Sequence, residues 1–164
     1  MNTTMDDVYA VQNPALGATI IWQFVSGYYS VNASAVPFPL LFVVLPIIYN
    51  EELRTVIKST QARSGLSKIS EKLIKHKSND SLYSIHAVAE SLKMTSLQSI
   101  CIASDTKLIY VDLSSALVFP ISNKKPPKLR SSEIAHMHSS AFKIGQWCAG
   151  LSLVDICRQL KVRF

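Results

Sequence analysis

Apolar residues recur every three to four positions along most of the chain, which predicts a protein built largely of helices. The first apolar stretch begins at Asn13-Pro14, a capping side chain followed by proline at the first helical position. Its apolar side chains cover nearly the whole circumference of the helix, so we expect this helix to be buried. A second apolar helix is expected to open at Pro37 and Pro39. Pro46 should kink or end it, because proline lacks the backbone donor.

Capping residues and breaks in the apolar pattern predict the other helices. Acidic residues after Asn50 suit the first turn of a helix, and Gly150 with Ser152 interrupts the last long pattern. The expected helices run from Asn50 to about Thr60, from Ser67 over one short amphipathic segment, from Asp80 to about Ser104, from Ser131 or Ser132 to Gly150, and over residues 153–160.

The period of the pattern changes after residue 105. Residues 108–111 and 116–119 are β-prone runs separated by a short polar turn, which predicts a hairpin. A helix followed by a hairpin has the order of the second half of a winged-helix module. We therefore expect a mainly α fold, a compact helical domain with one two-stranded β-hairpin and a winged-helix-like middle part. The expected single domain, 1–164, comprises apolar helices over 13–60, a helix and hairpin over 80–120, a basic loop over 121–130 and C-terminal helices over 131–161.

An uncharged block at residues 35–49 raises the question of a membrane segment. It is shorter than the roughly 20 residues that a spanning helix needs, and three prolines interrupt it, so we expect a core helix and no membrane contact. The three cysteines, Cys101, Cys148 and Cys157, have no pairing pattern, which indicates free thiols in the reducing cytoplasm. Cys101 and Cys148 fall within apolar patterns and are expected to be buried.

Charge is scarce and unevenly distributed. Only 17% of the residues are charged against 48% hydrophobic, which favours some apolar surface that packs against a partner. The net charge is +6, and residues 1–50 contain no Lys or Arg. Four cations, Lys124, Lys125, Lys128 and Arg130, form a basic loop that contains prolines but no aromatic residue for base stacking. This loop is consistent with a solvated segment, with contacts to a nucleic-acid backbone, or with an acidic protein partner.

The residues that usually carry catalysis show no productive pattern. His136 and His138 are two residues apart, so on a helix their side chains diverge and cannot share a metal ion. The sequence has no cysteine pair with zinc-site spacing, no glycine-rich phosphate loop and no Gly-x-Ser-x-Gly motif. We expect no enzymatic activity, no cofactor and no metal. The aromatic residues are instead candidates for partner binding, namely Trp22, Phe38, Phe42, Phe142 and Trp147.

Both ends of the chain carry motifs of a known family. The N-terminal motifs are Asn-Pro-Ala-Leu-Gly-Ala-Thr-Ile-Ile-Trp-Gln-Phe-Val-Ser-Gly-Tyr at 13–28 and Pro-Phe-Pro-Leu-Leu-Phe-Val-Val-Leu-Pro at 37–46. The C-terminal motifs are Ala-Phe-Lys-Ile-Gly-Gln-Trp-Cys-Ala at 141–149 and Ile-Cys-Arg-Gln-Leu-Lys-Val-Arg at 156–163. Together they resemble the middle components of bacterial three-component ABC ATPase systems. Three departures are Cys148 in place of an aromatic residue, Lys161 in place of glycine, and a missing closing proline.

The resemblance implies a role in a Lamassu-type defence system against phage and plasmids. It implies a small accessory subunit that links an SMC/Rad50-like coiled-coil ATPase to an effector, expected to be a nuclease. ATP, Mg²⁺ and the main DNA path would belong to the ATPase, while the basic loop could contact the DNA backbone within the complex. The alternative from the residues alone is a free-standing winged-helix protein that binds DNA.

Overall fold

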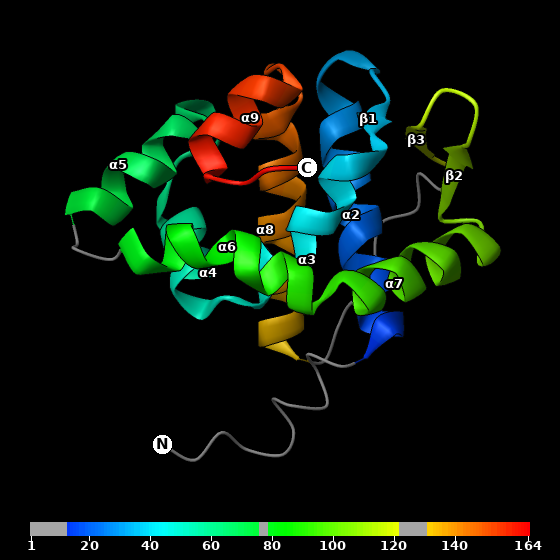
Figure 1. Cartoon of the computed structure of the whole chain (residues 1–164), viewed down its shortest axis with the longest axis horizontal. Helices are drawn as coiled ribbons and strands as arrows, with labels where there is room; N and C mark the ends of the chain where they lie inside the picture. Colours follow the sequence, from blue (N-terminus) through cyan, green and yellow to red (C-terminus); the bar gives the residue numbers. More distant parts are fainter. Residues whose placement is uncertain (1–12, 76–78, 122–130) are drawn as a thin grey trace.

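The computed structural model describes residues 13–75, 79–121 and 131–164, and these residues form a mainly helical protein with a small sheet at one end (Figure 1). The α-helices are α2 (Pro14–Asn32), α3 (Leu41–Tyr49), α4 (Glu51–Ser59), α5 (Ser67–Lys75), α6 (Asn79–Ser91), α7 (Lys93–Asp105), α8 (Ser132–Cys148) and α9 (Leu153–Leu160). The strands are β1 (Val36–Pro37), β2 (Ile109–Asp112) and β3 (Leu117–Pro120).

The helix starts lie where the capping residues predict them. The Asn13 side chain accepts a hydrogen bond from the Ala15 amide at 3.0 Å, and Asn50 accepts one from Leu53 at 3.0 Å. Ser131 and Ser152 cap α8 and α9 in the same way, through the amides of Ile134 and Asp155. Each cap satisfies a backbone donor that a helix N-terminus otherwise leaves without a partner, which explains why local sequence sets these boundaries so well.

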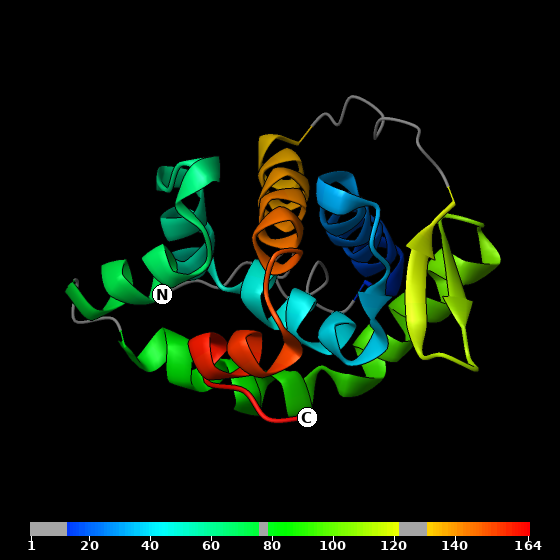
Figure 2. The ribbon, with the colours of Figure 1, turned by 90° about the horizontal axis from the view of Figure 1, so that it is seen from above.

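Helices α2 and α8 stand side by side at the centre of the molecule (Figure 2). A Cβ atom on Gly27 would lie 2.0 Å from the Phe142 carbonyl oxygen, and one on Gly145 would lie 2.2 Å from the Phe24 carbonyl oxygen. Only glycine allows backbones to approach so closely. The apolar stripe predicted on this last long helix is buried against α2, with Met137, Ala141, Ile144 and Cys148 all in the core.

The sheet has three strands, so the predicted hairpin is present but is extended by one strand that was not predicted. Strands β2 and β3 form the predicted antiparallel pair, and β1 adds to the other edge of β3 through Val36 opposite Val118. A residue before proline favours extended backbone, which makes Val36 suited to strand pairing ahead of Pro37. The winged-helix likeness of the middle part is not confirmed.

Two helices differ in length from the sequence-based prediction. The helix expected over residues 80–104 is two helices, α6 and α7, that meet at Leu92 and follow each other along one side of the molecule (Figure 2). The apolar helix α3 does not end at Pro46 but continues to Tyr49. The expectation that Cys101 is buried is also wrong, because this residue lies on the exposed side of α7.

One core of buried apolar residues extends from Ala18 in α2 to Val162 beyond α9. The block at 35–49 supplies several of its fully buried members, including Leu40, Leu41 and Leu45. In the part of the chain that the structure describes, no helix combines the length and the apolar character needed to cross a membrane.

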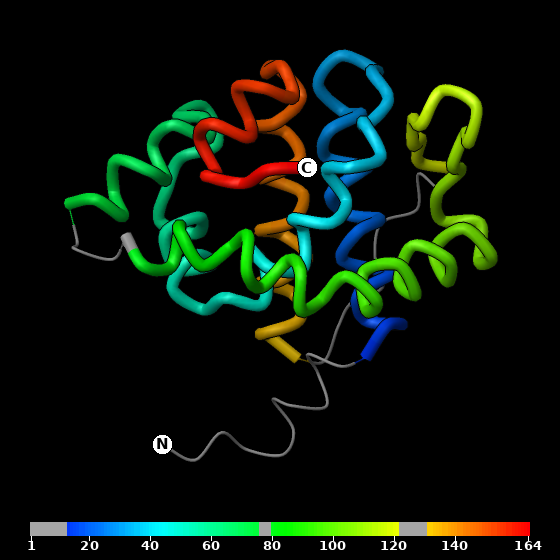
Figure 3. Tube along the Cα trace, in the orientation of Figure 1, coloured from blue at the N-terminus to red at the C-terminus, as the bar shows by residue number. Residues whose placement is uncertain are grey.

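The chain leaves α9 through Lys161, whose backbone is left-handed at φ 57° and ψ 34°. Figure 3 shows the trace turning back at this point toward the middle of the molecule. A left-handed residue after a helix is usually glycine because glycine has no Cβ penalty. The left-handed backbone at Lys161 agrees with the glycine that the family resemblance predicts at this position.

Candidate functional site

Two of the five aromatic candidates are buried within the chain. Trp22 is 4% exposed and Trp147 is 6% exposed. The Trp147 indole nitrogen donates to the Ala62 carbonyl at 2.6 Å, and the Lys143 ammonium lies 5.8 Å from its ring centroid. Both tryptophans therefore pack within this chain, and they leave almost no side-chain surface for a partner.

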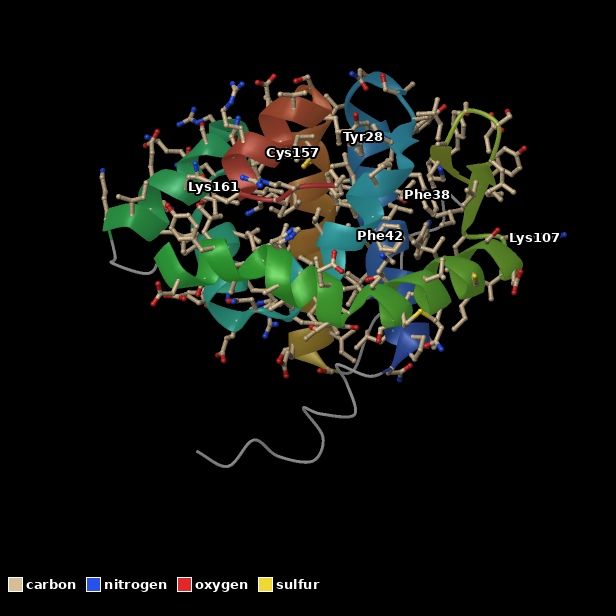
Figure 4. All side chains as sticks on the ribbon, viewed as in Figure 1. Tyr28, Phe38, Phe42, Lys107, Cys157 and Lys161 are labelled. Carbon is tan, nitrogen blue, oxygen red and sulfur yellow. The ribbon has the colours of Figure 1, made fainter. Side chains whose placement is uncertain are left out.

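The three phenylalanine candidates are half-buried. Phe38 and Phe42 form an edge-to-face pair with ring centroids 5.6 Å apart, and Figure 4 shows them near each other on one side of the molecule. Phe142 lies on α8, where its carbonyl faces Gly27. Half-buried aromatic rings keep a fixed orientation while presenting apolar surface, which suits them to anchor a partner. Partner binding through Phe38, Phe42 and Phe142 stays a prediction.

A cavity of about 190 Å³ lies beside Phe42. It is formed where the segment after α9 returns to α3 and α6, and its lining is more apolar than polar at the surface. Glu90, Lys93 and Arg163 stand around it. Its lining residues are Phe42, Val43, His86, Ala89, Glu90, Lys93, Val162, Arg163 and Phe164. An apolar floor with a charged rim is the pattern of a surface that binds another chain.

A second and larger cavity, of about 390 Å³, separates α4 from the first half of α8. Its two most enclosed cations already have partners in the chain. Arg54 donates to the Ile48 carbonyl at 2.7 Å and contacts Glu133 at 3.2 Å, while Lys143 donates to the carbonyls of Ile57 and Thr60. Cations placed at helix C-termini offset the negative end of the helix dipole. The polar contacts around this cavity therefore connect α8 to the C-terminal ends of α3 and α4.

The four cations of the basic loop, Lys124, Lys125, Lys128 and Arg130, lie outside the described residues. Their contact with a nucleic-acid backbone stays a prediction. Among the described residues, the cations Lys58 and Lys107 are exposed, and Lys107 stands at the far end of α7 beside the sheet (Figure 4).

Burial changes the pKa of several titratable groups among the described residues. Across residues 13–75, 79–121 and 131–164, no three His, Cys, Asp or Glu side chains are placed to hold a metal ion. Burial raises the pKa of Cys148 to about 12 and also raises the pKa of Cys157, so both thiols stay protonated at neutral pH. The Nε2 atom of His138 lies 2.9 Å from the Thr19 hydroxyl, but its buried Nδ1 has no hydrogen-bond partner that would orient it as a base.

Sequence reasoning missed the apolar surface of α7. It predicted that Cys101 is buried, whereas Cys101 is exposed and the neighbouring Leu97 is 39% exposed. Met94, one turn earlier, is 64% exposed. The available signal was the run of small residues at Ser96, Ser99 and Ala103, which has the spacing of a helix face that packs closely against a neighbour.

Comparison with family models finds a match over the whole chain. The model of the ABC-three component (ABC-3C) system Middle Component 3 matches residues 1–164, the whole chain. Comparisons with curated proteins and with solved structures give no match.

Proposed function

Since the chain belongs to the family of ABC-three component system middle components, we propose that it is a non-catalytic adaptor that links the ABC component to the effector component. The match over residues 1–164 is the observation that carries this proposal, because a three-component system implies two further proteins that assemble with this one. The half-buried pair Phe38 and Phe42 and the neighbouring apolar cavity support it, since they are features of a binding surface.

A finer proposal about the partners is supported by the family resemblance of the motifs at the two ends of the chain. We propose that the ABC component is a coiled-coil ATPase of the SMC/Rad50-like type, that the effector is a nuclease, and that the system acts against phage and plasmid DNA, as in Lamassu. In this scheme nucleotide and Mg²⁺ bind to the ABC component. The adaptor holds the effector near the ATPase and contributes its basic loop to the DNA backbone.

Co-purification of the three components tests the linking role. The tagged ABC component is expressed with the effector, once with this chain and once without it. We expect the effector to co-purify only when this chain is present. Recovery of the same amount of effector in both preparations would contradict a linking role, even if the chain itself binds to the ABC component.

DNA binding is tested on the assembled complex with Lys124, Lys125, Lys128 and Arg130 changed to Gln. We expect weaker binding to DNA of any sequence and a shallower dependence of the affinity on salt. The reason is that a complex with fewer phosphate contacts releases fewer counterions from the DNA when it binds. An unchanged affinity and salt slope would remove the loop from the DNA path without affecting the linking role.

A further inference from the structure

Helix α7 buries Ile100 together with several small side chains, and it exposes a row of apolar side chains on its outer face. The inward positions Ser96, Ser99 and Ala103 are completely buried. The outward stripe consists of Met94 at 64% exposure, Leu97 at 39% and the exposed Cys101. The outer face of an amphipathic surface helix normally carries polar residues, so an apolar row in this position is unusual.

Part of the inward face consists of small residues because α7 crosses close to α2. A Cβ atom on Gly17 of α2 would lie 2.2 Å from the Ser99 hydroxyl oxygen, so larger residues at this crossing would clash. This packing explains the buried serines, but it does not explain the outward residues. A polar residue at position 94 or 97 would leave the contact with α2 unchanged and would avoid exposing apolar surface to water.

The outward stripe has the spacing of a helix that docks into a partner. Its members are three and four residues apart, at positions 94, 97 and 101, which places them in one row along two helical turns. Helix recognition uses such rows of anchors. Between Lys93 and Asp105, the two ends of α7, the chain carries no charged residue, so the surface suits an uncharged apolar row on the partner.

The size of the stripe argues against a second copy of this chain as the occupant. Three side chains over two turns offer much less than the roughly 800 Å² per partner that a stable standard-size interface buries. A contact of this size is stable when other contacts already hold the two proteins together, as in an assembly of several components. The helices of a coiled-coil ATPase carry apolar residues at the same alternating spacing of three and four.

We propose that the outer face of α7, formed by Met94, Leu97 and Cys101, docks against an apolar row on a helix of the ABC component. This inference rests on the proposed function. It adds the surface through which the adaptor recognises the ATPase, whereas the linking role by itself does not specify any surface.

The test measures the affinity of the full-length chain for the purified ABC component and, separately, for the purified effector. Met94→Glu and Leu97→Glu each place a charge on the docking row. Tyr83→Glu on α6 and Val154→Glu on α9 are matched controls, since these side chains are 63% and 65% exposed. Thermal unfolding followed by circular dichroism checks that each variant is folded, and Met94→Glu covers the case in which the less exposed Leu97 does not tolerate the charge.

We expect the Kd for the ABC component to rise at least about tenfold for Met94→Glu and Leu97→Glu, and to change by less than about twofold for the two controls. Unchanged affinity of both α7 variants, with normal binding by the wild-type chain, would overturn the inference and leave the proposed function intact. A loss confined to effector binding would overturn the choice of the ABC component. A wild-type dimer that Leu97→Glu dissociates in light scattering would assign the face to a second copy instead. Failure of the wild-type chain to bind the ABC component would overturn both the inference and the proposed function.

Discussion

Helix α2 makes two close crossings, one with α8 and one with α7. These two helices differ in whether the face that points away from α2 is covered by other residues. The far side of α8 is also covered, because Trp147 bonds to Ala62 and Lys143 reaches the end of α4. The far side of α7 is open and carries Met94 and Leu97. Helices α2 and α8 therefore form the structural centre of the protein, whereas α7 has an outer face that the described residues leave exposed.

The two crossings also differ in what limits their approach. At α8 the atoms nearest to a Cβ on Gly27 or Gly145 are backbone atoms, which cannot move without shifting a helix. At α7 the atom nearest to a Cβ on Gly17 is the Ser99 hydroxyl, the end of a side chain. We therefore expect the α8 crossing to tolerate an added methyl group less well than the α7 crossing does.

The largest expected effect comes from Gly145→Ala. The new methyl group would overlap the Phe24 carbonyl and the Tyr28 amide nitrogen, so the two helices must separate. We expect a loss of about 3 kcal/mol in the free energy of unfolding, measured in urea, despite the better helix propensity of alanine. Gly150→Ala is the control, because a Cβ there has no neighbour within 4 Å and should change the free energy by less than about 0.5 kcal/mol. Equal stability of Gly145→Ala and wild type would contradict the close crossing.

Gly17→Ala should have a smaller effect at the α7 crossing. We expect a loss of about 1 to 2 kcal/mol, because the Ser99 side chain can yield part of the space. Ser99→Ala removes the clashing oxygen, so the double variant should recover at least about 0.5 kcal/mol relative to the sum of the two single changes. Strict additivity in this double-mutant cycle would mean that the two residues are not in contact.

The smallest expected effect is a pH dependence of the free energy of unfolding, and it arises at the α8 crossing. His138 of α8 is buried beside Thr19 of α2, and burial lowers its pKa from 6.5. The unfolded chain therefore binds the proton at a higher pH than the folded chain does. Stability should be complete above pH 6.5 and should fall as the pH drops below that value toward the lower pKa of the folded state. His138→Gln should flatten this part of the pH profile of the unfolding free energy, and an equally steep profile in the variant would contradict this assignment.

Local patterns were sufficient to predict most helix boundaries. Caps at Asn13, Asn50 and Ser131 act within three residues of themselves, so the sequence around each one determines where the helix begins. The buried stripe on α8 was also predictable, since the spacing of its apolar residues identifies the inward face. The family resemblance, based on motifs at the two ends of the chain, is confirmed by the match over the whole length.

The features that sequence reasoning missed depend on contacts between distant segments. The pairing of Val36 with Val118 joins residues far apart in the chain, and neither local sequence indicates the other. The close approach of α7 to α2 brings Ser99 against Gly17, a residue far away in the chain, and the local sequence of α7 does not indicate this contact. Trp22 and Trp147 looked like partner contacts because they lie off the main apolar rows, but the core extends around both helices.

The most direct test of the account is the reactivity of Cys101 in the free chain and in the complex with the ABC component. Each cysteine is alkylated for increasing times, and the peptides containing Cys101, Cys148 and Cys157 are followed by mass spectrometry. The account predicts that Cys101 reacts readily in the free chain and at least about tenfold more slowly in the complex, while the buried Cys148 reacts slowly in both. An equal rate for Cys101 in the free chain and in a fully formed complex would contradict the claim that the outer face of α7 is covered by the ABC component.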